Sequence, residues 1–372
     1  MPTIKGTSPE NHGAKSWLRP SVNWLLAFVP VAVALDRLGA KPPLVFFAAA
    51  LAIIPIASWI VRATEQLATY TGDAVGGLLN GTFGNAPELI IGVVALRAGL
   101  FDMVLASLVG AILANLLLAL GVAFFLGGLR YRDQEYRPEA TRVYLSMMLL
   151  AVTSMAVPSA LHASSEGTAP AAEQHLNLAV AMILLATYGL YVFFMLKTHK
   201  HLFATEGGHE GHDEGGPRWS VARALGTLAA ASVLAAWMSE VLVGAAEGTG
   251  EALGLSKAFV GLVFLAIVGG AAESGSAIAM GRANRMDLAV SIAIGSCIQI
   301  ALFVAPLLVL LSYAVAPQPL LLLFPKALVV TTFIAVVVAA VVIGDGKSNW
   351  FKGVQLVVVY ALIALLAFFV GV

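Results

Sequence analysis

The feature that most constrains this chain is a series of apolar runs, each about 20 residues long, that recurs over most of its length. A run of that length and composition crosses the hydrocarbon core of a bilayer as a single helix. Hydrophobic residues make up 59% of the 372 residues and charged residues only 11%, which excludes a water-soluble globular fold. The runs predict an all-α, polytopic membrane protein with eleven spans, at residues 21–39, 42–61, 73–98, 101–127, 142–163, 176–196, 219–247, 254–280, 286–313, 319–343 and 350–371.

Charge and cysteine content exclude several classes of partner and site. The formal net charge is zero, so the sequence gives no case for nucleic acid as a partner, and the lipid bilayer is the one surrounding that it predicts. One cysteine, Cys297, rules out a disulfide framework and a cysteine-cluster metal site. The first apolar run follows a basic N-terminus but lacks a clear cleavage motif, so we interpret it as a retained helix.

The distribution of basic residues predicts the orientation. With the N-terminus inside, 16 lysines and arginines fall in segments on the inner side and five on the outer side. We therefore expect a cytoplasmic N-terminus and an outer C-terminus. The short N-terminus without a transit peptide favours a bacterial inner membrane.

The chain divides into four parts. Residues 1–41 form a cytoplasmic tail and the first helix, 42–196 a first unit of five helices, 197–218 a cytoplasmic linker and 219–372 a second unit of five helices. The linker is rich in histidine and acidic residues and could sense a divalent metal. A solvated linker is the interpretation we favour. The residues concerned are His199, His201, Glu206, His209, Glu210, His212, Asp213 and Glu214.

The two units contain related sequences. When Glu88 is set on Glu273, three further pairs fall into step without gaps: Arg97 with Arg282, Asp102 with Asp287, and Gly110 with Gly295. Because each unit has five spans, an odd number, the second unit enters the membrane from the opposite side. The sequence therefore predicts two inverted-topology repeats, an architecture in which the binding site lies near the midplane between the repeats.

Glu88 and Glu273 each lie in the middle of an apolar run, where a carboxylate costs about 3 kcal/mol on insertion scales. Gly84 and Asn85 precede the first glutamate, and Gly269 and Gly270 precede the second. Such residues favour a helix break, which frees backbone carbonyls and is tolerated where it lines an enclosed cavity. Carbonyl and carboxylate oxygens together suit a hard cation such as Ca²⁺, which takes about six to eight oxygen ligands.

Two close carboxylates in a low dielectric cannot both stay ionised once the cation has left, so they titrate as a unit. Protons and a divalent cation would then compete for one site, and a site that holds either one acts as an exchanger. The alternative is that the glutamates only hold helices together by hydrogen bonds. For two carboxylates at equivalent positions beside helix breaks, we favour the shared site.

Other polar residues in the apolar spans are candidates for a second layer or a proton path. Interhelical hydrogen bonding without a role in transport is an equal alternative for the four uncharged residues. For the two glutamates of this layer, a carboxylate near water at a helix end is at least as good an interpretation. The candidates are Glu65, Ser107, Asn115, Glu240, Ser296 and Gln299.

The motif at residues 77–90, Gly-Leu-Leu-Asn-Gly-Thr-Phe-Gly-Asn-Ala-Pro-Glu-Leu-Ile, resembles the first signature of the calcium/proton exchangers, the cation/H⁺ antiporter branch of the calcium/cation antiporter superfamily. Residues 239–240, 269–273, 286–289 and 295–304 resemble its second half. The resemblance implies eleven helices, two inverted five-helix repeats and Ca²⁺ efflux driven by inward proton movement. It further implies that Glu88, Glu273 and Asn85 coordinate the cation.

The chain departs from this family pattern in the second repeat. Gly270 stands where the family has asparagine, Ser274 where it has histidine, and Cys297 where serine is common. The loss of an amide oxygen removes a neutral ligand, so a backbone carbonyl or water would take its place. Na⁺ or K⁺, singly or alongside Ca²⁺, therefore stays open as the transported cation.

Other functions are less well supported by the sequence. An intramembrane metal-dependent hydrolase would need motifs such as His-Glu-x-x-His or Gly-x-Ser-x-Gly, and neither occurs. No ATP site is found, which argues against a primary pump, and no cofactor is predicted. A cation channel more often builds its selectivity from symmetric subunits than from an inverted repeat. The prediction is thus an antiporter, not an enzyme, with Ca²⁺ and protons as its substrates.

Overall fold

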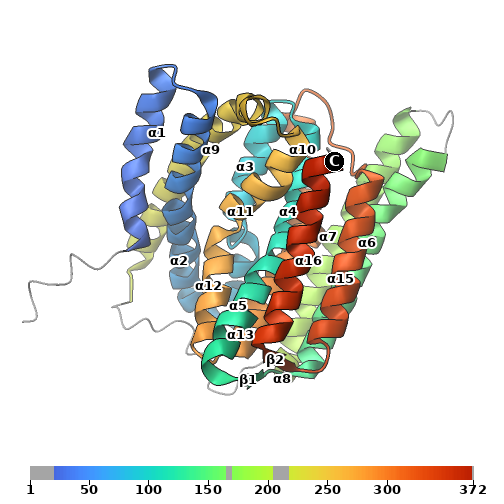
Figure 1. The fold of residues 1–372 in the computed structure, drawn as a ribbon. Coiled ribbons are helices and arrows are strands. Elements are labelled where there is room, and N and C mark those ends of the chain that lie inside the picture. The colour runs from blue at the N-terminus through green and yellow to red at the C-terminus, as the bar shows by residue number, and fades with distance from the viewer. Residues whose placement is uncertain (1–20, 165–169, 204–217, 371–372) are drawn as a thin grey trace, which may run out of the picture.

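The computed structural model describes residues 21–164, 170–203 and 218–370, and nearly all of these residues are helical. Figure 1 shows the long helices standing side by side, with α1 at the left of the view and the C-terminal end of α16 at the upper right. The elements up to residue 203 are η2 (Val22–Ala27), α1 (Phe28–Arg37), α2 (Pro42–Phe83), α3 (Ala86–Arg97), α4 (Phe101–Leu113), η3 (Ala114–Ala119), α5 (Leu120–Tyr131), β1 (Asp133–Glu135), α6 (Pro138–Ser164), α7 (Pro170–Phe193), η4 (Phe194–Thr198) and α8 (Lys200–Phe203).

The second half is also helical. Its elements are α9 (Val221–Leu253), α10 (Lys257–Phe259), η5 (Val260–Leu265), α11 (Ala266–Gly269), α12 (Ala271–Arg282), α13 (Met286–Gln299), η6 (Ile300–Val304), α14 (Ala305–Val315), α15 (Lys326–Ile343), β2 (Lys347–Asn349) and α16 (Trp350–Val370). The segments η3, η4, η5 and η6 are π-helical, and η2 is a 3₁₀ helix.

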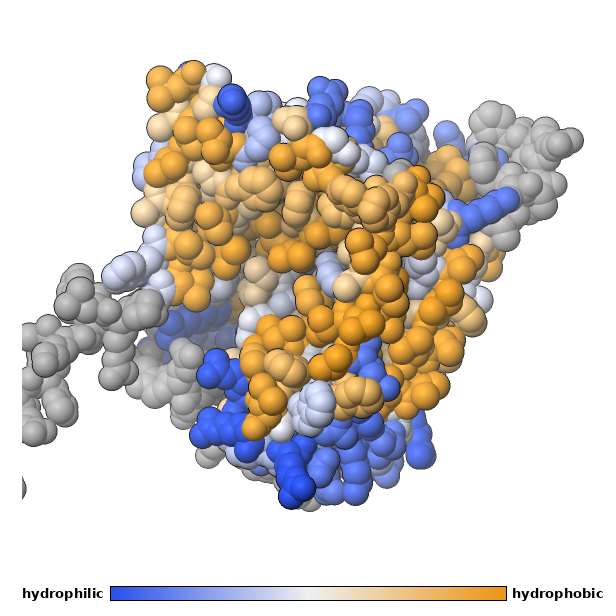
Figure 2. Space-filling view, viewed as in Figure 1, coloured by the Kyte–Doolittle hydropathy of each residue, from blue (hydrophilic) through white to orange (hydrophobic). Residues whose placement is uncertain are grey.

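The described residues contain eight helices that are long and apolar enough to span a membrane, or nine if a helix pair bent by 60° between Gly269 and Ala271 is one span. Figure 2 shows the corresponding surface, an apolar belt between hydrophilic ends. The chain is therefore a multi-pass integral membrane protein. The eleven spans expected from the sequence remain a prediction, because α1 with its 3₁₀ segment and the 12-residue helix α3 are each too short to be counted as a span.

The separate helix end expected near residue 61 is wrong. Helix α2 continues through the polar residues that follow and ends at Phe83. The chain bends sharply within α2, because a methyl group added at Gly76 would lie 3.2 Å from Ala68 Cβ, eight residues earlier, a contact that a straight helix does not allow. The chain breaks instead at Gly84 and Asn85, where the glycine-containing motif predicts a break.

Several boundaries recur at a fixed spacing of 185 residues. Helices α3 and α12 each have 12 residues and begin at Ala86 and Ala271. Helices α4 and α13 begin at Phe101 and Met286, and each runs into a π-helical segment, η3 and η6. The two spans that contain these π segments, Phe101–Tyr131 and Met286–Val315, are also the most enclosed, 83% and 67% buried. They form the centre of the helical packing.

Glycines let the central helices approach to backbone contact. A methyl group added at Gly110 in α4 would overlap the backbone carbonyl of Leu262 in η5, and one added at Gly261 in η5 would lie 2.5 Å from the carbonyl oxygen of Met103 in α4. The contact is thus reciprocal. In lipid, where apolar helices gain little by leaving their surroundings, such small-residue contacts allow the close van der Waals packing that holds helices together.

Residues 316–325, between α14 and α15, contain no helix, yet several of them are buried. Asn177 on α7 makes two hydrogen bonds to the backbone of this segment. Its Nδ2 donates to Leu320 O (2.8 Å) and its Oδ1 accepts from Leu322 N (2.8 Å). Ser312 Oγ accepts from Leu320 N (2.8 Å) as well. Non-helical backbone away from water needs such partners.

The short strands β1 and β2 pair antiparallel, with Gln134 opposite Ser348. They join the connection between α5 and α6 to the connection between α15 and α16. Sequence patterns did not predict this pair, since each strand has only three residues and its register depends on the packed helices.

The glycine contact gives a matched test of the packing. We expect Gly110→Ala to destabilise the folded protein by about 1–3 kcal/mol, because the added methyl meets fixed backbone. Gly295, the equivalent residue in the second unit, has no atom within 4 Å of an added methyl, so Gly295→Ala should leave the melting temperature unchanged or raise it. Thermal unfolding of both variants in detergent measures the difference, and equal behaviour would contradict the proposed contact.

Candidate functional site

Glu88 and Glu273 occupy the same place in two equivalent half-helices. Each is the third residue after a break, Glu88 in α3 and Glu273 in α12. The helices before the breaks, α2 and α11, end at Phe83 and Gly269. At each break the carbonyl just before the half-helix accepts from its first turn, Asn85 O from Leu89 N (3.1 Å) and Gly270 O from Ser274 N (2.9 Å).

The two breaks face each other. A methyl group added at Gly269 would lie 3.0 Å from Glu88 Cγ, and one added at Gly270 would lie 3.6 Å from Glu88 Oε1. Glu88 therefore reaches the break that precedes Glu273, and its carboxylate lies within electrostatic range of Glu273. The structure thus brings Glu88 to Gly269 and Gly270, the two glycines that the sequence singled out before Glu273.

The carboxylates themselves are unsatisfied. All four oxygens, Oε1 and Oε2 of Glu88 and of Glu273, are shielded from solvent and have no hydrogen-bond partner among the described residues. The Glu273 residue as a whole is 9% exposed. A buried charge without a partner is strongly unfavourable, so these four oxygens need a proton or a cation.

A chain of side-chain hydrogen bonds lies beside the glutamates and links the two halves. Asn85 Nδ2 donates to Gln299 Oε1, and Asn85 Oδ1 accepts from Ser296 Oγ (3.0 Å). Ser296 Oγ in turn accepts from Asn115 Nδ2 (3.2 Å), and Asn115 Oδ1 accepts from Ser274 Oγ (3.0 Å). These bonds fix the polar side chains around the breaks, while the carboxylates stay outside the network.

Three of the uncharged second-layer candidates, Asn115, Ser296 and Gln299, belong to this network. Ser107 does not, because its hydroxyl donates to Val104 O of its own helix (2.8 Å). Ser274 is a member that the sequence marked only as a departure from the family pattern. Its place directly after Glu273 was the signal that could have found it.

The two outlying glutamates differ from each other. Glu65 on α2 is half-buried and lies within electrostatic range of Glu273. Glu240 on α9 is exposed and pairs with Arg97 at 3.8 Å. Only Glu65 is therefore placed where it could influence the central carboxylates. In the linker, residues 206–214 lie outside the described residues, and His199 stacks on Phe194 with ring centroids 4.1 Å apart.

Oxygen is the donor that this site offers. In the described part of the chain no three His, Cys, Asp or Glu side chains gather into a group that could hold a metal ion. Two carboxylates would neutralise a divalent ion, and the remaining ligands would have to come from amides, hydroxyls, backbone carbonyls or water. This donor set suits a hard cation such as Ca²⁺ and does not suit a soft one.

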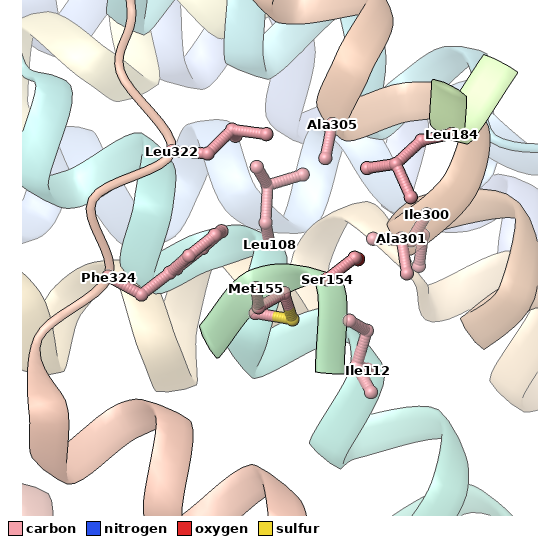
Figure 3. Close-up of a pocket in the computed structure, with 10 residues that line it drawn as sticks. All are labelled: Leu108, Ile112, Ser154, Met155, Leu184, Ile300, Ala301, Ala305, Leu322 and Phe324. Carbon is pink, nitrogen blue, oxygen red and sulfur yellow. The ribbon is translucent and has the colours of Figure 1, made fainter. Parts of the chain in front are cut away.

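An apolar pocket lies apart from the glutamates, between α4, α6, α7 and the segment around Leu322 (Figure 3). Leu108, Met155 and Phe324 are among its lining residues. The one hydroxyl in the lining, that of Ser154, donates to Ala151 O (2.6 Å). Nine of the ten lining residues are apolar, so the pocket is poorly suited to a cation.

Comparison with known proteins identifies the family. The sodium/calcium exchanger protein family matches residues 41–197 and 223–369, which is more than half of the chain. The chain belongs to the sodium/calcium exchanger protein family. Exchangers are transport proteins, so this family member is a transporter and not an enzyme, and the resemblance found in the motifs is confirmed.

Individual relatives agree with this assignment. The chain is 40% identical to a Ca²⁺/H⁺ antiporter of Synechocystis over 363 residues, which cover 93% of this chain and 96% of the relative. It is 39% identical to the Ca²⁺/H⁺ antiporter ChaA of Bacillus subtilis, with 91% and 96% covered. The solved structure of native YfkE superposes with a TM-score of 0.80 at 36% identity, covering 94% of this exchanger and all of YfkE. The H⁺/Ca²⁺ exchanger CAX, at 14% identity and a TM-score of 0.68, shares the fold.

Cation binding at the glutamates predicts a thermal signature. At pH 8, we expect Ca²⁺ to raise the melting temperature of the purified wild-type exchanger, since a ligand at about 100 times its dissociation constant adds about 2.7 kcal/mol to stability. Glu88→Gln and Glu273→Gln should remain folded and lose this increase. The matched control is Glu247→Gln, because Glu247 is exposed and pairs with Lys257 away from the breaks. An undiminished Ca²⁺ effect in both central variants would place the cation elsewhere.

Proposed function

We propose that this exchanger is a secondary active antiporter that moves Ca²⁺ against H⁺ by alternating access at one midplane site formed by Glu88 and Glu273. The observation that carries the proposal is the set of four buried carboxylate oxygens without partners at two facing helix breaks. The relatives named Ca²⁺/H⁺ antiporters support the choice of substrates.

The coupling follows from the chemistry of the pair. When Ca²⁺ is bound, both carboxylates are ionised and balance its charge. When Ca²⁺ leaves, two adjacent anions in a low dielectric are unfavourable, so protons bind in its place. Because each state of the site is filled by one kind of ion, the carrier returns loaded with the other, and net transport of Ca²⁺ requires opposite movement of protons. Asn85, Gly84, Gly269 and Gly270 would line the same site.

Two inverted repeats of five helices would provide the two access states. Support comes from the 185-residue spacing of α3 with α12 and of α4 with α13, and from the π segments that follow α4 and α13. The family match falls in two stretches, residues 41–197 and 223–369, which agree closely with the proposed units 42–196 and 219–372. The remaining parts are the first helix with its tail, residues 1–41, and the linker, residues 197–218.

The proposed orientation places the N-terminus in the cytoplasm and the C-terminus outside, in a bacterial inner membrane. The basis is the excess of basic residues at one end. Arg130, Arg282 and Lys352 lie at ends of α5, α12 and α16 that would then all face the cytoplasm, as would the part of α2 around Arg62.

A second candidate, a Na⁺ or K⁺/H⁺ antiporter with the same mechanism, is favoured by one feature. Gly270 brings no side chain to the site, and the nearest amide nitrogen to a methyl added there is Asn115 Nδ2 at 3.4 Å. Fewer neutral oxygens are then fixed around the carboxylates. A cation that needs fewer ligands than Ca²⁺ would therefore lose less binding affinity than Ca²⁺ does. Ca²⁺ remains the better choice, because two carboxylates balance two charges.

Transport in liposomes tests the proposal. With an imposed pH gradient, we expect Ca²⁺ uptake coupled to opposite proton movement, abolished in Glu88→Gln and in Glu273→Gln and retained in Glu247→Gln. Uptake of Ca²⁺, Na⁺ and K⁺ is measured separately, with the lumenal pH followed in each case. If proton movement is coupled only to Na⁺ or K⁺ uptake, the transported cation is Na⁺ or K⁺ and not Ca²⁺. Cation flux that ignores the pH gradient, or normal exchange in either central variant, would contradict the shared site.

A further inference from the structure

The start of α9 is fixed to α2 at the end of the molecule where both helices leave the apolar belt. The backbone N–H of Trp219 donates to Gln66 Oε1 (3.0 Å), and its carbonyl accepts from the Tyr70 hydroxyl (2.6 Å). In Figure 1 this junction lies at the lower left, where the beginning of α9 meets the lower part of α2. The Trp219 backbone and the Tyr70 side chain are thus fixed to each other.

Three arginines surround these rings. The guanidinium carbon of Arg223 lies 4.6 Å from the centroid of the Trp219 ring, and that of Arg62 lies 5.6 Å from it. The guanidinium of Arg218 lies 5.7 Å from the Tyr70 ring. The Arg62 and Arg223 guanidinium carbons are therefore within about 10 Å of each other, the sum of their distances to one centroid. We call Arg62, Arg218 and Arg223 the arginine cluster.

The arginine cluster has no acidic partner among the described residues. None of the ion pairs between described side chains includes any of its members, and all three are exposed. The described carboxylate nearest along α2, Glu65, is half-buried and lies within electrostatic range of Glu273. Contact with an aromatic ring engages the face of a guanidinium and leaves the N–H donors at its edge available. Three neighbouring cations with free donors form a site for an anion.

The surroundings indicate which anion. Val221 and Leu225, in the first turns of α9, are 42% and 52% exposed, so an unpartnered apolar surface begins directly beside the cluster. Tryptophan and tyrosine are enriched at the level of lipid headgroups, and basic pockets between helices at that level bind anionic headgroups. A free phosphate ion would bind the arginines and leave the neighbouring apolar surface exposed. A phospholipid binds the arginines through its phosphate and covers the apolar surface with its acyl chains.

We propose that the arginine cluster, with Trp219 and Tyr70, binds the phosphate of an anionic phospholipid whose acyl chains lie along Val221 and Leu225. The lipid bridges the start of α9 and the stretch of α2 around Arg62 and Tyr70, one helix from each half of the chain. This site is separate from the glutamates, and the proposal does not depend on the exchange reaction.

Lipid binding is measured on the full-length protein in detergent by native mass spectrometry, with phosphatidylglycerol as the probe and phosphatidylcholine as the neutral comparison. We expect preferential binding of phosphatidylglycerol, lowered roughly tenfold or more in affinity in the double variant Arg62→Gln/Arg223→Gln. The matched control is Arg130→Gln, because Arg130 also lies over a ring, Tyr131, at 5.2 Å but stands outside the cluster. The control should bind as the wild type does.

Each other outcome overturns the proposal. Equal binding of both lipids, an unchanged affinity in the double variant, or an equal loss in Arg130→Gln would show that no specific headgroup site exists. Displacement of phosphatidylglycerol by millimolar inorganic phosphate would make the ligand a soluble anion. If the double variant unfolds, the single variant Arg218→Gln takes its place, because Arg218 lies before the start of α9. Arg218→Gln should weaken phosphatidylglycerol binding on its own.

Discussion

The burial of two carboxylates without hydrogen-bond partners is the constraint on which the rest of the structure depends. Glu88 and Glu273 stand at the starts of α3 and α12, and their four oxygens are shielded from water. The neighbouring polar side chains, from Gln299 through Asn85 and Ser296 to Asn115 and Ser274, satisfy one another. The network thus fixes the polar side chains around the breaks, and the carboxylates stay available to the transported ions. A carboxylate with a permanent partner would lose this freedom.

Backbone contact between helices makes this arrangement possible. Gly110 and Gly261 bring α4 and η5 together, and η5 leads through α11 to the break before Glu273. The same central region contains η3 and η6, π-helical segments that interrupt the regular helix at equivalent places in the two halves. Such segments are frequent at functional sites, because they alter local backbone hydrogen bonding without ending the helix. Close packing and irregular backbone therefore occur together around the site.

Much of this could be predicted from the sequence. The apolar runs predicted a helical membrane protein, and the glycines beside the glutamates predicted breaks where the structure has them, at Gly84 and Gly270. The end of α2 was misjudged, since the chain bends between Ala68 and Gly76 without ending the helix. The bond of Ser274 to Asn115 and the pairing of β1 with β2 could not be predicted. Both depend on the register between segments far apart in the chain, which no local pattern encodes.

The central claim is that one site holds either Ca²⁺ or protons, and proton release on Ca²⁺ binding tests it most directly. Calorimetric titration of the purified exchanger with Ca²⁺, in buffers of different ionisation enthalpy, counts the protons released per ion bound. The account predicts release of about one to two protons at neutral pH, because the cation displaces those shared by Glu88 and Glu273. Ca²⁺ binding with no proton release between about pH 6 and 8 would contradict it, since the carboxylates would then already be ionised without the cation.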